Sequence, residues 1–489
     1  MIGLAQLGGP IACLGLALLL VAKTRRDRIA GLGFAVFGTG VLGAAVAPHR
    51  PLEVVGGIFA ALALGLALAL LFRRLPWLLP LLALACVPAR VGVHVGGSSS
   101  KLLLPLYVVI LGAAILLAWD LVGGDTRVRE LRAAAWPLAA FIGWTGLSLA
   151  WSKDLSEGAI EVLAFYVPFT VLAIAIARLP WSDLGLRLLY VEVALMGLVF
   201  ALFGFYQYET RDIFQNPKVI TANAYAKFFR VNSVFWDPSV YGRFLVLAIA
   251  PSLVLIVFGR SIRVAAAAAA VAVVTWLGLL ISFSQSSFAA LLGVGIAVAF
   301  LTWRWRALIP VGLTIAVLAG MTVAQPQIRR SMQHHTSSSL NEATSGRSNL
   351  VSNGLRIAAH HPVLGVGVGG FKRAYADRVH LKGKDPKKAA SHNTPVTVAA
   401  ETGLVGLGLY AWLLVVLLLR AFRAPRSPLR TIAGLGIAAI FLHSLFYNAF
   451  FEDPMTWGLI GLLTLAARVP VRRVEPGEQR VAEQEAVPV

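Results

Sequence analysis

Long apolar runs recur along almost the whole chain, and they limit it to one class of fold. The runs are about 17–25 residues long, the length that an α-helix needs to cross the hydrocarbon core of a bilayer. Of the 489 residues, 58% are hydrophobic and 13% are charged, about half the charged fraction of a soluble domain. The alternating segments of about ten residues that mark a transmembrane barrel are absent. We therefore predict an all-α fold, a polytopic transmembrane helical bundle of about 12–15 spans.

The individual spans can be placed on the sequence. The run at 75–91 contains Pro76, Pro80 and Pro88, and the run at 455–468 is short. The predicted spans are 4–22, 29–46, 53–72, 75–91, 102–119, 134–150, 158–178, 186–207, 239–258, 264–282, 287–303, 307–324, 394–419, 431–450 and 455–468.

The basic residues indicate which side of the membrane each connection occupies. The net charge is +20, and every second connection between the predicted spans is basic. Connections rich in Lys and Arg stay in the cytoplasm, so the charge indicates topology and not nucleic-acid binding. We expect an integral protein of the cytoplasmic (inner) membrane with its N-terminus outside and its C-terminus inside.

This topology divides the chain into five parts. They are N-terminal transmembrane helices (1–207), a second helical group (208–325) that starts with an outer loop (208–238), a large extracytoplasmic loop containing short helices (326–393), C-terminal transmembrane helices (394–468) and a disordered cytoplasmic tail (469–489).

The large outer loop is unusually basic for its side of the membrane. Residues 326–392 hold eleven Lys and Arg against three acidic residues. Positive charge on this side favours an anionic ligand at the outer face. The alternative is that long loops cross the membrane regardless of their charge.

The sequence His392-Asn393-Thr394-Pro395 opens the apolar run at 394–419. Asn393 or Thr394 is a suitable helix cap, and Pro395 suits the first helical turn. His392 would then lie at the positive end of a helix dipole, which favours the neutral imidazole that a general base requires. The alternative is a boundary histidine that only makes hydrogen bonds.

Arg230 and Arg347 lie in polar stretches of the two long outer loops. A guanidinium group matches the geometry of phosphate and stays charged at any relevant pH. The alternative for each is an interfacial arginine beside an aromatic belt.

Three other sequence patterns do not indicate a binding or catalytic site. Residues 365–370 read GVGVGG and fit a dinucleotide fingerprint, but no βαβ unit surrounds them, so a close-packed turn is the better interpretation. The adjacent histidine pairs have no metal-ligand spacing, and the last outer connection, Tyr447–Pro454, is interpreted as a capped turn. We expect no cofactor and no metal.

Four stretches together resemble the O-antigen ligase and polymerase superfamily of membrane glycosyltransferases. Ser286 and Ser287 stand where the family turn often carries an arginine. The stretches are Arg230 with Phe235-Trp236-Asp237-Pro238-Ser239; Ser282 to Ser287; Gly346-Arg347-Ser348 with His361 to Gly367 and Phe371; and His392-Asn393 with Glu401 to Gly406.

The resemblance implies an inverting, metal-independent transfer of a glycan from a polyprenyl-diphosphate donor to an acceptor hydroxyl on the outer face. It implies that His392 is the general base and that Arg230 and Arg347 bind the diphosphate. Asn393, Lys372 and Arg373 are further candidates for substrate contact. The expected partners are the lipid-linked donor, a glycan or lipid acceptor and membrane lipids.

Two alternatives stay open. A polymerase of repeat units would differ from a ligase only in its acceptor. A lipid or polysaccharide transporter or flippase would need ionisable residues deep within the spans, and the sequence has few of these: Asp120, Glu161, Glu192 and His443.

Overall fold

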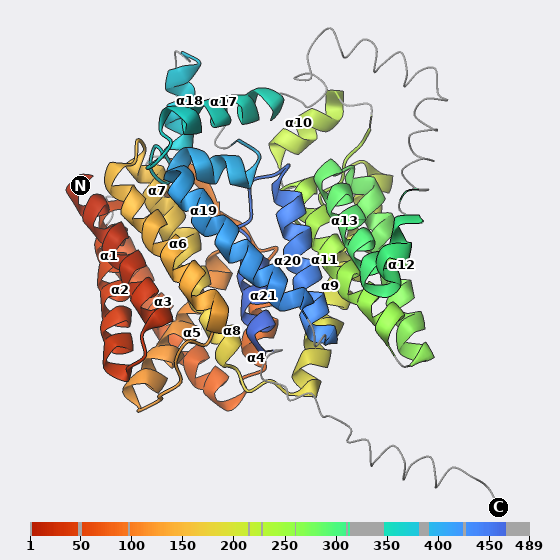
Figure 1. Cartoon of the computed structure of the whole chain (residues 1–489), viewed down its shortest axis with the longest axis horizontal. Coiled ribbons are helices and arrows are strands. Elements are labelled where there is room, and N and C mark those ends of the chain that lie inside the picture. Colours follow the sequence, from red (N-terminus) through yellow and green to blue (C-terminus); the bar gives the residue numbers. More distant parts are fainter. Residues whose placement is uncertain are drawn as a thin grey trace, which may run out of the picture.

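The chain is a bundle of apolar helices, as the computed structural model shows (Figure 1). Among the residues that the structure describes, 11 helices are long and apolar enough to cross a membrane. The predicted all-α polytopic fold is therefore confirmed. The described residues are 2–46, 51–95, 98–213, 216–225, 228–259, 261–309, 312, 347–380, 391–423 and 427–465.

The elements follow one another with short connections in most of the chain. The first half contains α1 (Ile2–Val21), α2 (Arg25–Val46), α3 (Pro51–Arg74), α4 (Leu78–Ala85), β1 (Val91–Val95), β2 (Ser98–Leu102), α5 (Leu104–Val122), η1 (Arg132–Ala134), α6 (Ala135–Ser148), η2 (Leu149–Trp151), α7 (Leu155–Glu161), a π-helical turn η3 (Val162–Tyr166), α8 (Val167–Arg178) and α9 (Asp183–Thr210). The second half contains α10 (Pro217–Tyr225), α11 (Pro238–Phe258), α12 (Ile262–Ser282), α13 (Gln285–Trp303), η4 (Arg304–Ala307), α17 (Arg347–His360), α18 (Phe371–Arg378), α19 (Thr394–Phe422), α20 (Pro428–Ser444) and α21 (Pro454–Leu465).

Four of the predicted spans do not correspond to a long apolar helix among the described residues. The spans expected at 431–450 and 455–468 are the shorter apolar helices α20 and α21. The span expected at 75–91 is wrong as a continuous helix, because α4 has only 8 residues and extends about 12 Å at 1.5 Å per residue. Most of the span expected at 307–324 lies outside the described residues.

Helices α3 and α5 run in the same direction, so the chain between them must return across the bundle. A Cβ on Gly65 of α3 would lie 2.9 Å from the Leu111 side chain of α5. Further along both helices, the Arg73 guanidinium lies over the Trp119 ring, 4.6 Å from its centroid. Residues 75–103 therefore cross from one end of the bundle to the other, with α4 as the helical part of that crossing.

A short hairpin is a departure from the all-α prediction. Strands β1 and β2 pair antiparallel, with Val91 opposite Leu102 and Val93 opposite Ser100. The β-branched residues Val91, Val93 and Val95 favour a strand over a helix here. The hairpin lies in the connection between α4 and α5 and leaves the helical bundle otherwise intact.

Three short helices lie across one end of the bundle. Figure 1 shows α10, α17 and α18 at the top, above the ends of α19 and α20. Two of them, α17 and α18, lie in the described part of the large loop at 326–393, which confirms the prediction that this loop contains short helices. Residues 326–346 and 381–390 of the loop lie outside the described residues. We refer to this end as the capped end.

The opposite end of the bundle holds a buried ion network. Arg28 and Arg178 each bind Oε1 of Glu130 at 2.6 Å, and Arg178 also binds Asp125 at 2.5 Å. Arg28 and Glu130 are almost completely buried. The network joins the first turn of α2, the connection after α5 and the last residue of α8, so some of the basic residues predicted from topology also hold these helices together.

Candidate functional site

The segment after α17 docks on a break in α19. Gly403 has φ 70° and ψ −171°, which interrupts the helix. The Val366 amide donates to the Ala400 carbonyl at 2.9 Å, and the Leu404 amide donates to the Pro362 carbonyl at 2.7 Å. Backbone groups released by a break in a membrane helix must be satisfied by the protein itself, and this loop satisfies them.

The glycines of the GVGVGG stretch permit this close docking. Gly365, Gly367 and Gly369 have φ values of 68°, 84° and 71°. A Cβ on Gly367 would lie 2.3 Å from Cα of Ser152, and one on Gly369 would lie 2.2 Å from the amide nitrogen of Gly158. The stretch is therefore a close-packed turn against η2 and α7.

Glu401 connects this turn to the next short helix. Its side chain is 6% exposed, and Oε1 accepts a hydrogen bond from the amide of Phe371, the first residue of α18, at 3.2 Å. The resemblance to the superfamily rests most on the stretches around His361–Phe371 and His392–Gly406. The structure brings these two stretches into contact, where they support α17.

Helix α17 lies on the start of α19. A Cβ on Gly354 would lie 2.6 Å from Cγ1 of Val396 and 3.4 Å from Cβ of Ser391. Arg347 is the first residue of α17, and its side chain is partly exposed. Arg347 and His392 are thus carried by two elements that pack on each other.

His392 stands immediately before the cap of α19. Oδ1 of Asn393 accepts a hydrogen bond from the Val396 amide at 3.0 Å, and a proline follows in the first turn. This confirms Asn393 as the predicted cap. His392 itself has φ 58°, a left-handed conformation that costs a non-glycine residue roughly 1–3 kcal/mol. Its ring lies edge-on to Tyr447, with 6.2 Å between the ring centroids.

Arg230 forms hydrogen bonds with two helices, through its backbone to α10 and through its side chain to α12. The Asn223 side chain of α10 donates to the Arg230 carbonyl at 2.9 Å and accepts from the Arg230 amide at 3.1 Å. Nε of Arg230 donates to the Ser282 carbonyl at the end of α12, at 3.2 Å. Helix α10 was not anticipated in the loop predicted at 208–238, yet it fixes the position of Arg230.

The two arginines lie within electrostatic range of each other. Burial is the main cause that lowers the pKa of Arg230, while the negative charge of Asp237 raises it and the positive charge of Arg347 lowers it. Two guanidinium groups repel each other, and an anion that binds between them removes this repulsion and stabilises both charges. The positive charge of Arg347 therefore acts on Arg230, and the shared binding of one diphosphate by the two residues stays a prediction.

His443 and Tyr447 were not assigned a role from the sequence, although His443 was noted as an intramembrane ionisable residue. The His443 ring, at the end of α20, lies 5.6 Å from the Tyr447 ring. Nε2 of His443 lies 3.0 Å from Oγ of Ser286 and 3.1 Å from the carbonyl of Ser239. A chain of three rings, His443, Tyr447 and His392, thus joins α20 to the start of α19.

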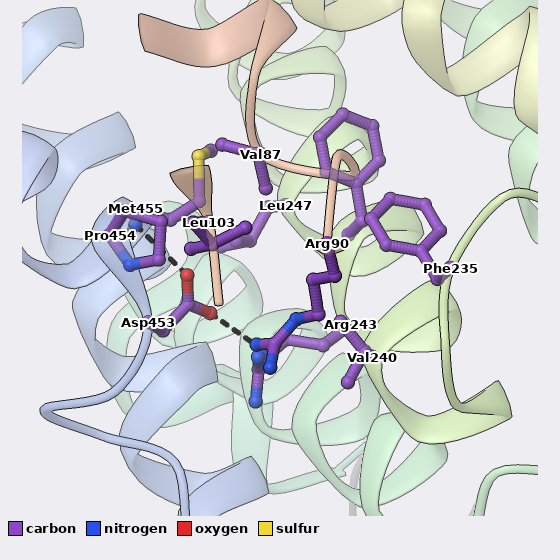
Figure 2. Close-up of a pocket in the computed structure, with 11 residues that line it drawn as sticks. Val87, Arg90, Leu103, Phe235, Val240, Arg243, Leu247, Asp453, Pro454 and Met455 are labelled. Carbon is purple, nitrogen blue, oxygen red and sulfur yellow. Dashed lines mark hydrogen bonds and ion pairs between the residues drawn. The ribbon is translucent and has the colours of Figure 1, made fainter. Parts of the chain in front are cut away.

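A buried ion pair ties the connection between α20 and α21 to α11. Nε of Arg243 lies 2.7 Å from Oδ2 of Asp453, and each side chain is 4% exposed. Figure 2 shows this pair in a small pocket that Arg90 also lines, close to Met455. Asp453 also accepts a hydrogen bond from the Met455 amide at 2.9 Å, so the predicted capped turn is also part of an ion pair across the bundle.

A second pocket, of about 30 Å³, lies beneath the start of α19, enough for one or two water molecules. Thr394 donates to Asn448 at 3.0 Å, and Asn448 donates to Glu452 at 3.2 Å along its wall. Burial raises the pKa of Glu452 to about 7, against the opposing charges of Arg90 and Arg243. The lining residues are Glu161, Phe165, Tyr166, Thr394, Thr397, Val398, Glu401, Asn448, Phe450, Phe451 and Glu452.

The three further candidates for substrate contact are Arg373, Lys372 and Asn393, and their surroundings differ from those of Arg230 and Arg347. Arg373 is on α18, where its side chain is 67% exposed and lies 3.8 Å from Asp377 of the same helix. Lys372 is partly exposed beside it. Nδ2 of Asn393 donates to the Leu445 carbonyl at 3.0 Å, while its Oδ1 accepts from the Val396 amide, so both ends of this side chain bind the protein. The geometry favours a structural role for Asn393 and a surface position for Arg373.

The fold and these residues place the protein in the class of polytopic membrane proteins, with a basic, histidine-bearing candidate site at the capped end. Residues 270–411 match the family model described as O-antigen ligase. This match supports the resemblance of the motifs to the O-antigen ligase superfamily of membrane glycosyltransferases. The matched region runs from α12 into α19 and contains Arg347 and His392, whereas Arg230 and Tyr447 lie outside it. No curated protein matches the chain.

Proposed function

We propose that this protein transfers a glycan from a polyprenyl-diphosphate donor to an acceptor hydroxyl, as an O-antigen ligase-type enzyme. The observation that carries the proposal is the packing of α17, which begins at Arg347, on the start of α19 directly after His392. A diphosphate leaving group and a hydroxyl nucleophile need a cation and a base at one site.

The arginines bind the diphosphate. Arginine presents a planar fork of donors that matches two phosphate oxygens. When the bond between the anomeric carbon and the diphosphate breaks, negative charge grows on the leaving oxygen. Arg230 and Arg347 stabilise that charge, so the reaction proceeds without a metal ion.

His392 acts as the general base. It removes the proton from the acceptor hydroxyl while the hydroxyl oxygen attacks the anomeric carbon from the face opposite the diphosphate. One glycosidic bond forms, the bond to the diphosphate breaks with inversion, and the polyprenyl diphosphate leaves. The positive end of the α19 dipole disfavours a second proton on the ring before the reaction.

The lipid tail of the donor leaves the site beside the end of α12. Phe228 is 61% exposed and stacks on Phe283 with 5.2 Å between ring centroids. Phe283 follows Ser282, the residue that holds Arg230. An exposed aromatic pair next to a diphosphate-binding arginine suits the point where a polyprenyl chain enters the bilayer.

The capped end faces the outside of the cytoplasmic membrane. The basic connections gather at the other end, near Arg28 and Arg178, and such connections stay in the cytoplasm. The site would therefore meet glycans that have already crossed the membrane.

A reconstituted transfer assay tests the proposal. The purified protein in liposomes is given a polyprenyl-diphosphate glycan and candidate acceptors, and the products are separated by mass. Transfer of one glycan block to a lipid or protein identifies a ligase, and a ladder of growing repeats identifies a polymerase with the same site. Absence of transfer to every glycan and lipid acceptor would reject the proposal.

A further inference from the structure

Tyr447 occupies the connection between α20 and α21, and its ring lies between two histidines. The centroid of its ring is 6.2 Å from that of His392 and 5.6 Å from that of His443. The Tyr447 side chain is partly exposed, whereas His443 is fully buried. The three rings therefore run from the protein interior toward the edge of the site.

The inner ring is fixed by two helices. Nε2 of His443 lies 3.1 Å from the Ser239 carbonyl on α11. The same nitrogen lies 3.0 Å from Oγ of Ser286, in the first turn of α13. These two contacts hold the His443 ring against α11 and α13, and the ring is tilted relative to that of Tyr447.

The connection that carries Tyr447 is fixed on both sides. Before it, the Leu445 carbonyl accepts from the Asn393 side chain at 3.0 Å. After it, Asn448 accepts from Thr394 at 3.0 Å, and Asp453 pairs with a buried arginine of α11. The ring of Tyr447 therefore has little freedom relative to the first turn of α19.

We propose that Tyr447, held in place by His443, is a positioning residue that orients the imidazole of His392. This inference rests on the proposed function, in which His392 is the base. His392 lies before the cap of α19 with a left-handed backbone, and its ring meets the Tyr447 ring edge-on. A displacement of about 1 Å at a reacting group can lower a rate by about 100-fold.

The decisive comparison is between Tyr447→Leu and Tyr447→Phe in the reconstituted transfer assay. Tyr447→Leu removes the ring and keeps an apolar side chain, and we expect kcat to fall by about 10-fold to 100-fold. The KM values for donor and acceptor should stay within about threefold, because neither substrate contacts Tyr447 in this account. Tyr447→Phe keeps the ring and should retain kcat within about threefold.

Two further variants separate orientation from stability. Phe446→Leu changes the neighbouring ring, which is 46% exposed, and should leave kcat unchanged. His443→Gln keeps an N–H donor near Ser239 but removes the ring behind Tyr447, and kcat should fall by about threefold to tenfold. All rates are expressed per folded molecule, measured by size-exclusion elution and thermal unfolding.

The outcomes for the two proposals are distinct. If the wild-type protein transfers glycan and Tyr447→Leu has wild-type kcat, the positioning role is wrong and the proposed function stands. A loss confined to KM, or an equal loss in Phe446→Leu, also overturns it. If the wild-type protein transfers nothing, the proposed function fails and the inference fails with it.

Discussion

At the scale of single residues, the candidate site combines groups whose local chemistry the sequence indicates with partners that only the fold reveals. Asn393 and the following proline form the expected cap because capping depends on neighbouring positions. The contact of His392 with Tyr447 depends on packing between α19 and the end of α20. No local pattern indicates such a contact.

Replacing the arginines should weaken the use of the donor. Arg230→Ala and Arg347→Ala each remove one charged fork from the diphosphate, and we expect kcat/KM for the donor to fall by about 10-fold to 1,000-fold. Arg230→Lys should recover part of the loss, since it keeps the charge and loses the fork. Arg356→Ala, on the exposed side of α17, is the matched control. Unchanged kinetics in both alanine variants would remove the arginines from the site.

Glu452 should make the stability of the protein depend on pH. Burial raises its pKa from 4.5 to about 7, so the folded protein holds the proton more tightly than the unfolded chain. The resulting stabilisation is fully present below about pH 4.5 and is lost as the pH rises through about 7. Glu452→Gln keeps an acceptor for Asn448 and has no charge, so its Tm should change less between pH 5 and pH 8. Parallel Tm curves for the variant and the wild type would contradict this assignment.

At the scale of elements, the stretches that resemble the superfamily pack together and hold α17 and α18 against α19. The turn at 362–370 satisfies the break in α19, and Glu401 caps α18. These contacts orient α17, which carries Arg347, over the segment that carries His392. The glycines and the glutamate therefore matter to the site through the position of α17.

Gly365→Ala tests this docking. Gly365 has φ 68°, and a Cβ there would lie 2.3 Å from the carbonyl carbon of Glu401. We expect a loss of at least about 2 kcal/mol in the free energy of unfolding, because a strained backbone and a backbone clash add. Gly408→Ala, on the same helix α19 with nothing within 4 Å of its Cβ, should gain about 0.5–1 kcal/mol instead. Equal Tm values for the two variants would show that the turn is not docked as described.

The sequence predicts the long helices better than the short elements between them. Continuous apolar runs placed the long helices, because the bilayer thickness sets the length of a span. The short α4, the β1–β2 hairpin and α10 were not predicted. Their positions depend on the parallel packing of α3 and α5 and on the hydrogen bonds between α10 and Arg230, which are contacts between distant parts of the chain.

At the scale of the whole molecule, the two ends of the bundle have different chemistry. One end holds the buried network around Glu130. The other is capped by α10 and α17 and carries the site (Figure 1). The segment at 75–103 crosses between the ends even though α4 is short, so it preserves the alternation of sides that the basic connections predict.

Labelling of single cysteines tests this orientation. In a variant without Cys13 and Cys86, a membrane-impermeant maleimide should label Ser352→Cys on α17 from outside intact cells. Arg26→Cys, exposed at the other end, should react only after the membrane is opened. The reverse pattern would place the capped end in the cytoplasm and contradict the proposed outer-face reaction.

The central claim is that His392 removes the proton of the acceptor hydroxyl. The most direct measurement compares glycan transfer by the wild type and by His392→Ala in liposomes, together with binding of the polyprenyl-diphosphate donor to each. A general base contributes about 100-fold to 10,000-fold. We therefore predict a loss of transfer of about that size, with donor binding unchanged because both arginines remain. Transfer at the wild-type rate by His392→Ala would contradict the claim.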